Sequence, residues 1–167
     1  MPVSLRMCYN RGQMTIAVTG ASGHIGANLV RALAANGDTV RCLVHVHSRA
    51  LEGLDVEKAP GDILDIDSLC RAFEEVDIVY HLAARISLSM KDFPAVEAVN
   101  VTGTRNVVEA CLQTGVKRLV HFGSIHAFQQ EPLDEPLDED RPLVSSPSAP
   151  AYDRSKALGI MEGRKGL

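Results

Sequence analysis

The chain has 167 residues, of which 46% are apolar and 23% charged, and its 17 basic and 21 acidic side chains give a net charge of −4. This is the composition of an ordinary globular domain, and it excludes disordered, collagen-like and disulfide-dense chains. The mild acidity leaves no basic footprint for nucleic acid, and an aromatic content of 4% without Trp leaves few stacking platforms for single strands. No apolar run reaches the roughly 18 residues of a membrane span.

The cysteines and the N-terminal segment bear on compartment and domain count. No two cysteines stand at CxxC spacing, and Cys42 and Cys111 lie in apolar segments typical of a core. Reduced thiols in the cytoplasm fit this usage best. Residues 1–13 lack the apolar stretch of a secretory signal, so we interpret them as an extension that precedes one domain at 14–167.

Short apolar runs alternate with segments of helical periodicity along the rest of the chain. Strands are predicted at 15–19, 39–44, 56–59, 78–82 and 118–123. Helices are predicted from Ile25 to the stop at Asn36-Gly37, from a cap at Asp67 or Ser68 through Phe73, from Pro94 to about Gln113, and from Tyr152 to Gly163. This alternation predicts a doubly wound parallel sheet of about five strands, in the order 3-2-1-4-5, with helices on both faces.

Residues 131–150 interrupt this pattern. The segment contains EPLDEPLDED, with six acidic residues, and carries five prolines in all. Proline fixes φ and removes a hydrogen-bond donor, so the segment is predicted to be a loop. Its acidic run is interpreted as a solvated face of that loop.

The first strand is followed by the glycine-rich sequence TGASGHIG at 19–26. A turn between a strand and a helix is where a pyrophosphate can bind, because the helix N-terminus presents free N–H groups and a positive dipole. Gly20 permits the tight turn, Gly23 admits the phosphates, and Gly26 allows close packing of helix on strand. The predicted phosphate-binding residues are Gly20, Ser22, Gly23, His24 and Ile25. A merely flexible glycine loop is the alternative, and the placement between strand and helix favours the binding turn.

This TGxxGxxG spacing resembles that of the short-chain dehydrogenase/reductase superfamily, and the resemblance extends over about residues 14 to 160. It implies that Asp62 contacts the adenine amino group while Ile63 packs on the ring, although an Asp in a turn also bonds its own backbone. The segment His81-Leu82-Ala83-Ala84 resembles the HxAA element of the family. There, small residues let the cofactor lie across the strand ends, so Leu82, Ala83 and Ala84 are predicted to contact it.

A second group of residues carries the predicted chemistry. Tyr152 and Lys156 stand four apart and share a helix face, and a nearby ammonium stabilises a phenolate, which suits Tyr152 to proton exchange. The resemblance implies that Lys156 also bonds the nicotinamide ribose and that Ser124 hydrogen-bonds the substrate oxygen. Asn100 opens NVTGTRN, which resembles the family element NxxGTxN, whose first Asn shapes the active-site backbone.

Within the superfamily, the chain is most similar to the extended branch of epimerases, dehydratases and dihydroflavonol reductases. The resemblance implies an NAD(P)-dependent oxidoreductase acting on a small carbonyl or alcohol or on a nucleotide sugar, and it leaves room for a homodimer. Extended members are longer and carry a second, substrate-binding lobe, and we expect this lobe to be missing here. We therefore expect a poorly buttressed Tyr152 helix and a fifth strand at an exposed edge. A non-catalytic dinucleotide-binding module or remnant is the alternative.

The end of the second strand bears on the choice of dinucleotide. Folds that prefer NAD place a carboxylate there for the ribose hydroxyls, and this chain has none before Glu52. His45 and Arg49 would instead receive a 2′-phosphate, which favours NADP over NAD, unless this segment is only a solvated loop. His45 and His47 are too few for a metal site, and none is predicted.

Overall fold

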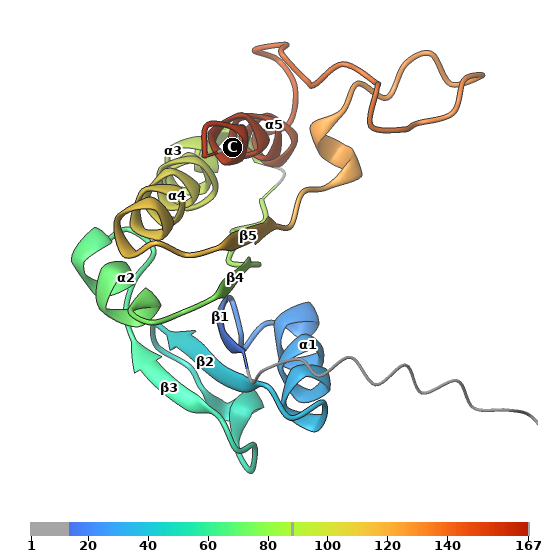
Figure 1. Cartoon of the computed structure of the whole chain (residues 1–167). Coiled ribbons are helices and arrows are strands. Elements are labelled where there is room, and N and C mark those ends of the chain that lie inside the picture. Colours follow the sequence, from blue (N-terminus) through green and yellow to red (C-terminus); the bar gives the residue numbers. More distant parts are fainter. Residues whose placement is uncertain (1–13, 88, 167) are drawn as a thin grey trace, which may run out of the picture.

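The computed structural model describes residues 14–87 and 89–166, so the predicted extension at 1–13 lies outside the described residues. The strands are β1 (Thr15–Thr19), β2 (Thr39–Val44), β3 (Glu57–Pro60), β4 (Ile78–His81) and β5 (Arg118–His121). They form one parallel sheet in the order β3-β2-β1-β4-β5, which confirms the predicted topology (Figure 1). Within this sheet β5 pairs with β4 alone and is the predicted edge.

The helices connect successive strands and lie on both faces of the sheet. They are α1 (His24–Ala35), α2 (Ile66–Phe73), α3 (Phe93–Glu97), α4 (Gly103–Thr114) and α5 (Ala151–Arg164). The π-helical turn η3 (Ala98–Thr102) joins α3 to α4, and the 3-10 turns are η1 (Arg49–Leu51), η2 (Met90–Asp92) and η4 (Ile125–Ala127). None of the helices in the described ranges is long and apolar enough to cross a membrane.

Alternating strand residues divide the core between the two faces. On β1, Ile16 and Val18 are buried against α1, whereas Ala17 belongs to the cluster under α2 and α4 that contains Phe73 and Val107. Figure 1 shows α1 on one side of the sheet and α2, α4 and α5 on the other. Because all the strand pairs are parallel, the carboxyl ends of the five strands lie at the same edge of the sheet.

The cap of α2 differs from the prediction. Asp65, rather than Asp67 or Ser68, is the N-cap, because its carboxylate accepts the backbone N–H groups of both of those residues. Ser68 uses its hydroxyl differently: its one hydrogen is shared between the carbonyl oxygens of Asp62 and Asp65, which lie 3.1 and 2.8 Å from Oγ. Three acidic or hydroxyl side chains within four positions compete for the same role, and the first of them reaches the free N–H groups.

The expectation of a poorly buttressed Tyr152 helix is wrong. Glu162 of α5 is buried and accepts hydrogen bonds from the guanidinium of Arg105 on α4 at 3.0 and 3.2 Å. On the same helix, a Cβ at Gly159 would lie 2.6 Å from the carbonyl oxygen of Asn100, so α5 packs directly on the backbone of η3. A glycine contact and an ion pair between the buried carboxylate of Glu162 and the partly exposed Arg105 therefore hold α5 against η3 and α4.

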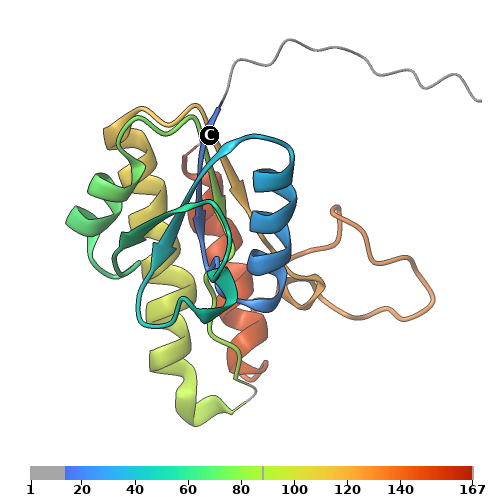
Figure 2. The ribbon, with the colours of Figure 1, turned by 90° about the horizontal axis from the view of Figure 1, so that it is seen from below.

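Residues 131–150 form the predicted loop, which projects away from the sheet in both views (Figures 1 and 2). Its acidic side chains are exposed, as expected. Arg141 is buried, and its guanidinium donates to the carbonyl oxygens of Pro132, Glu135 and Pro136. One side chain thus gathers the backbone of a segment that has no regular structure of its own.

Candidate active site

A groove of about 510 Å³ lies at the carboxyl ends of β1, β2, β3 and β4. Most of the predicted cofactor residues line it: Gly20, Ser22, Gly23, His45, Asp62, Ile63, Leu82, Ala83 and Ala84. The other predicted cofactor residues are not part of this wall: His24, Ile25, Arg49, Tyr152 and Lys156. The structure adds lining residues that the sequence analysis missed, chiefly Leu43, His47, Gly61 and Val99. The strand order brings together four loops that are distant in the sequence.

The glycine turn is shaped by close backbone approach. Gly20 has a φ of +68°, and a Cβ at this position would lie 2.6 Å from the backbone nitrogen of Ala83. A Cβ at Gly26 would collide with the carbonyl oxygen of Gly20. Gly23 is the N-cap of α1, so the free N–H groups of that helix begin at the groove. This is a cradle that side chains would fill, and it fits the pyrophosphate of a dinucleotide.

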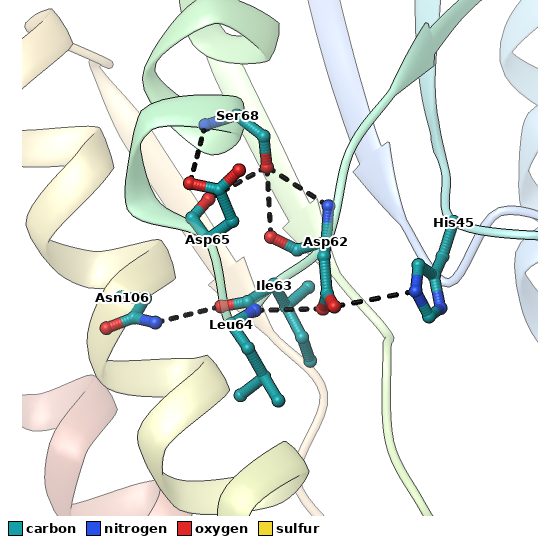
Figure 3. Close-up of polar contacts among 7 residues, drawn as sticks. All are labelled: His45, Asp62, Ile63, Leu64, Asp65, Ser68 and Asn106. Carbon is teal, nitrogen blue, oxygen red and sulfur yellow. Dashed lines mark hydrogen bonds and ion pairs between the residues drawn. The ribbon is translucent and has the colours of Figure 1, made fainter.

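Asp62 serves its own turn and the groove at the same time (Figure 3). One carboxylate oxygen accepts the N–H of Leu64 at 3.0 Å, and the backbone N–H of Asp62 donates to Ser68 at 3.0 Å. Asn106 holds the next residue by donating to the carbonyl oxygen of Ile63 at 3.0 Å. The turn is therefore fixed from α2 and α4, and the second carboxylate oxygen of Asp62 points across the groove.

That second oxygen faces His45, whose Nε2 lies 3.4 Å away (Figure 3). The sequence analysis found no carboxylate at the end of β2, and the structure supplies one from β3. Val44 and Pro60 are register partners in the parallel pair β2–β3, so the residues that follow each strand come side by side. The predicted strand order already placed the third strand beside the second, so the proximity of Asp62 to His45 could have been inferred from it. Because Asp62 approaches His45 and Arg49 lies outside the groove wall, the 2′-phosphate site predicted from the sequence is weakened.

The predicted acid–base residues come from η4 and α5. Ser124 caps η4, and its Oγ accepts the N–H of His126 at 3.2 Å. The ring of His126 meets that of Tyr152 edge-on, with 6.0 Å between centroids. Lys156 is buried and donates from Nζ to the carbonyl oxygen of Phe122 at 2.6 Å, and its burial lowers the pKa of this ammonium. The structure thus places the turn of Ser124 beside Tyr152, with Lys156 beneath the end of β5.

His126 and Asp153 are polar neighbours of this site that the sequence analysis did not assign to it. The Nδ1 of His126 lies 3.5 Å from Oδ1 of Asp153, whose side chain is largely buried. The signal for both was their position, since His126 follows Ser124 by two residues and Asp153 follows Tyr152 directly.

Asn100 lies in η3 and connects two segments of the site. Its Oδ1 accepts the N–H of Arg85 at 2.8 Å, and its Nδ2 donates to the carbonyl oxygen of Arg85 and to Oγ of Ser155, each at 2.9 Å. All of its amide hydrogens are therefore used, so one orientation is fixed. Asn100 ties the segment after β4 to the helix that carries Tyr152.

No group of three metal-ligating side chains occurs within residues 14–87 and 89–166. His45 approaches Asp62, and the described cysteines Cys42, Cys70 and Cys111 are free thiols. Cys42 and Cys111 are core residues, as predicted, and burial raises the pKa of their thiols to about 11 and about 12.

A parallel five-stranded sheet with a glycine turn at the carboxyl end of β1 defines a Rossmann-like dinucleotide-binding fold. The chain belongs to the NAD dependent epimerase/dehydratase family, which it matches over residues 16–164.

Two curated relatives illustrate the likeness. Sterol demethylase protein B of Methylococcus capsulatus is 41% identical over 162 residues, which cover 92% of this chain and 48% of the relative. L-arabinose 1-dehydrogenase (NAD(P)(+)) of Haloferax volcanii is 39% identical over 153 residues, which cover 86% of this chain and 58% of the relative.

A solved structure, the UDP-glucose 4-epimerase of Thermus thermophilus in complex with NAD, superposes with a TM-score of 0.78 at 31% identity. The match covers 91% of this chain and 50% of that one. The chain thus spans about half the length of the proteins it matches.

Proposed function

We propose that this chain binds NADP or NAD in the groove and that Tyr152, Lys156 and Ser124 manage the proton of an oxidoreduction at a substrate carbonyl or alcohol. The observation that carries this is the cradle around Gly20, which leaves room for a pyrophosphate where a side chain cannot fit. When bound, the nicotinamide would supply or accept the hydride. The remaining roles belong to residues of this chain.

The groove residues divide among the parts of a dinucleotide. The turn at residues 20–23 and the N-terminus of α1 bind the pyrophosphate through backbone N–H groups. Asp62 and Ile63 hold the adenine by a hydrogen bond and by packing, and the turn that carries them is fixed by Ser68 and Asn106. Leu82, Ala83 and Ala84 line the groove between the proposed pyrophosphate and adenine sites.

Near α5, the described hydrogen bonds leave the hydroxyl hydrogen of Ser124 free to be donated to a substrate. The Oγ of Ser124 accepts from His126, so its own hydrogen can be donated to a substrate oxygen. Tyr152 exchanges the proton of that oxygen, and the positive charge of Lys156 stabilises the phenolate. Asn100 keeps this helix in register with the groove through Ser155.

The names of the relatives support the proposed substrate class. The relatives include proteins named for a sterol, for L-arabinose and for UDP-glucose, so the proposed substrate is a small carbonyl or alcohol or a nucleotide sugar. A homodimer is retained as a prediction of the resemblance.

We propose NADP as the preferred dinucleotide because the segment after β2 offers His45, Ser48 and Arg49 and no carboxylate of its own. The carboxylate of Asp62 opposes this preference. The competing function is dinucleotide binding without turnover, which the cradle around Gly20 would support on its own.

Calorimetric titration with NADPH and NADH tests the binding, and oxidation of either cofactor in the presence of a panel of aldehydes, ketones and nucleotide sugars tests the chemistry. We expect saturable binding at one site, tighter for NADPH, and turnover with at least one carbonyl class. Binding without any turnover selects the non-catalytic module. Failure to bind either dinucleotide overturns the proposal.

A further inference from the structure

Five buried polar side chains form one continuous path of hydrogen bonds through the middle of the molecule. They are Thr19, His81, Thr104, Asn100 and Ser155, and none exposes more than 3% of its surface. The path runs from the end of β1, next to the glycine turn, through β4 and α4 to α5. Polar groups this deeply buried are costly unless each is satisfied, so their donors and acceptors can be assigned.

The assignment begins at α5. The hydroxyl of Ser155 donates to the carbonyl oxygen of Tyr152 at 2.7 Å and accepts from Nδ2 of Asn100 at 2.9 Å. The hydroxyl of Thr104 donates to the carbonyl oxygen of Asn100 at 2.8 Å. A hydroxyl has one hydrogen, so towards His81, whose Nε2 is 3.0 Å away, Thr104 can only accept. His81 must therefore carry its hydrogen on Nε2.

The other ring nitrogen then completes the path. With Nε2 protonated in a neutral imidazole, Nδ1 of His81 is an acceptor, and the hydroxyl of Thr19 at 2.7 Å donates to it. The oxygen of Thr19 accepts in turn from the N–H of Ala83 at 3.3 Å. In the opposite tautomer Nδ1 would donate to the oxygen of Thr19, and the hydrogen of Thr19 would lose its acceptor. An imidazolium would leave the hydrogen of Thr19 without a partner.

The surroundings of His81 also disfavour its charged form. Burial, the proximity of His121 with ring centroids 5.3 Å apart, and the charge of Lys156 lower the pKa of His81 to about 3. Burial and Lys156 lower the pKa of His121 to about 4. These groups, on β5 and α5, are the charged or titratable neighbours that act on the His81 ring.

Each end of the path reaches one half of the site. At one end, Thr19 directly precedes Gly20 and holds Ala83, so both walls of the phosphate cradle are attached to it. At the other end, Asn100 and Ser155 hold α5 between Tyr152 and Lys156. We propose that His81, fixed as the neutral Nε2–H tautomer, is a positioning residue that sets the cofactor turn and the Tyr152 helix in one frame. This inference rests on the proposed function for its consequence, but not for the tautomer.

The tautomer is tested without cofactor or activity. Long-range nitrogen–proton correlation on the uniformly nitrogen-15-labelled chain distinguishes Nε2–H, Nδ1–H and imidazolium forms of each histidine. We expect His81 to give the Nε2–H pattern throughout from pH 8 to pH 5. An Nδ1–H pattern, or an imidazolium within this range, would overturn the assignment.

Two substitutions at His81 separate its hydrogen bond to Thr19 from its hydrogen bond to Thr104. In His81→Asn the amide oxygen replaces Nδ1 and can still accept from Thr19, whereas in His81→Gln the amide nitrogen replaces Nε2 and can still donate to Thr104. We expect His81→Asn to keep dinucleotide affinity within about 2-fold and lose about 10-fold in kcat, and His81→Gln to lose about 10-fold in affinity, the size of one lost buried hydrogen bond.

The hydrogen bond between His81 and Thr104 can also be removed while His81 stays intact. Thr104→Val removes the acceptor of Nε2 at nearly constant volume, whereas Thr104→Ser retains the hydroxyl and should restore kcat. If either His81 variant fails to fold, the Thr104 pair decides the question. Wild-type affinity and kcat in all folded variants would overturn the positioning role. If the unaltered chain binds no dinucleotide, the proposed function fails, and the positioning role fails with it, whereas the tautomer assignment is judged by the spectrum alone.

Discussion

The groove at the ends of β1 to β4 is shaped by backbone, whereas the region around α5 is shaped by side chains. At Gly20 and Gly26, any side chain would collide with neighbouring backbone atoms. Around α5, positions depend on hydrogen bonds made by Asn100, Ser155 and Lys156 to distant segments. Backbone-defined sites leave a sequence signature because only glycine fits, while side-chain sites depend on contacts that the sequence does not show.

Loss of one hydroxyl should have the largest effect on chemistry. Tyr152→Phe removes the group that exchanges the substrate proton, so turnover should fall by about 100-fold or more, the usual contribution of general acid–base catalysis. Dinucleotide affinity should stay unchanged. The matched control is Tyr80→Phe, which makes the same change in the core beside α1 and should preserve turnover. Steady-state kinetics and calorimetry measure both, and full activity in Tyr152→Phe contradicts the assignment.

Alanine substitutions at two glycines with positive φ test whether the backbone around Gly20 shapes the binding groove. Gly20→Ala brings its Cβ to 2.6 Å from a backbone nitrogen, whereas Gly37, with a φ of +86°, faces open space. Both changes carry the strain of left-handed backbone, about 1–2 kcal/mol. Only Gly20→Ala should also abolish dinucleotide binding, by more than about 10-fold. Equal losses of affinity in the two variants, measured by titration, would show that the cradle is not the binding site.

Acid should destabilise the folded chain through His81, which is buried, and through His121, which is half-buried with both ring nitrogens shielded from solvent. Burial lowers the pKa of His81 to about 3 and that of His121 to about 4, whereas in the unfolded chain both titrate near 6.5. Between these values the unfolded chain binds protons that the folded chain does not, so the stability is present above pH 6.5 and is lost as the pH falls. Each histidine contributes up to about 1.4 kcal/mol per pH unit. Urea unfolding at a series of pH values measures the slope.

The matched variant for this experiment is His121→Phe, which removes one of the two imidazoles whose pKa is lowered in the folded chain. The fall in the free energy of unfolding between pH 6.5 and 4 should become clearly shallower. A slope that does not change would assign the acid sensitivity to other groups.

The smallest effect concerns the choice of dinucleotide. Asp62→Asn keeps an oxygen for the N–H of Leu64 but removes the negative charge that faces His45 at 3.4 Å. The affinity for NADPH relative to NADH should rise by a few fold, because a 2′-phosphate would no longer meet a carboxylate. Arg49→Ala is the comparison, and it should lower this ratio, because the proposed NADP preference relies on Arg49 in the segment after β2. Tighter binding of NADH by the unaltered chain would contradict the NADP preference.

The sequence predicted the sheet order and most of the groove because both depend on local signals. Apolar runs of β length alternate with helices, and Gly20 and Gly26 mark a turn that no other residue can form. The contact of Asp62 with His45 was missed because it depends on β2 and β3 lying side by side. The close packing of α5 was missed because it depends on η3, which turns the carbonyl of Asn100 towards Gly159. Helix periodicity does not reveal this contact.

The central claim, that a dinucleotide binds across the backbone-defined groove, is tested most directly by mapping amide chemical shifts of the full chain during titration with NADPH. The account predicts the largest changes at residues 20–23, 62–64 and 82–84, with smaller changes at the start of α5. Changes confined to other surfaces, or no changes at saturating concentrations, would contradict it.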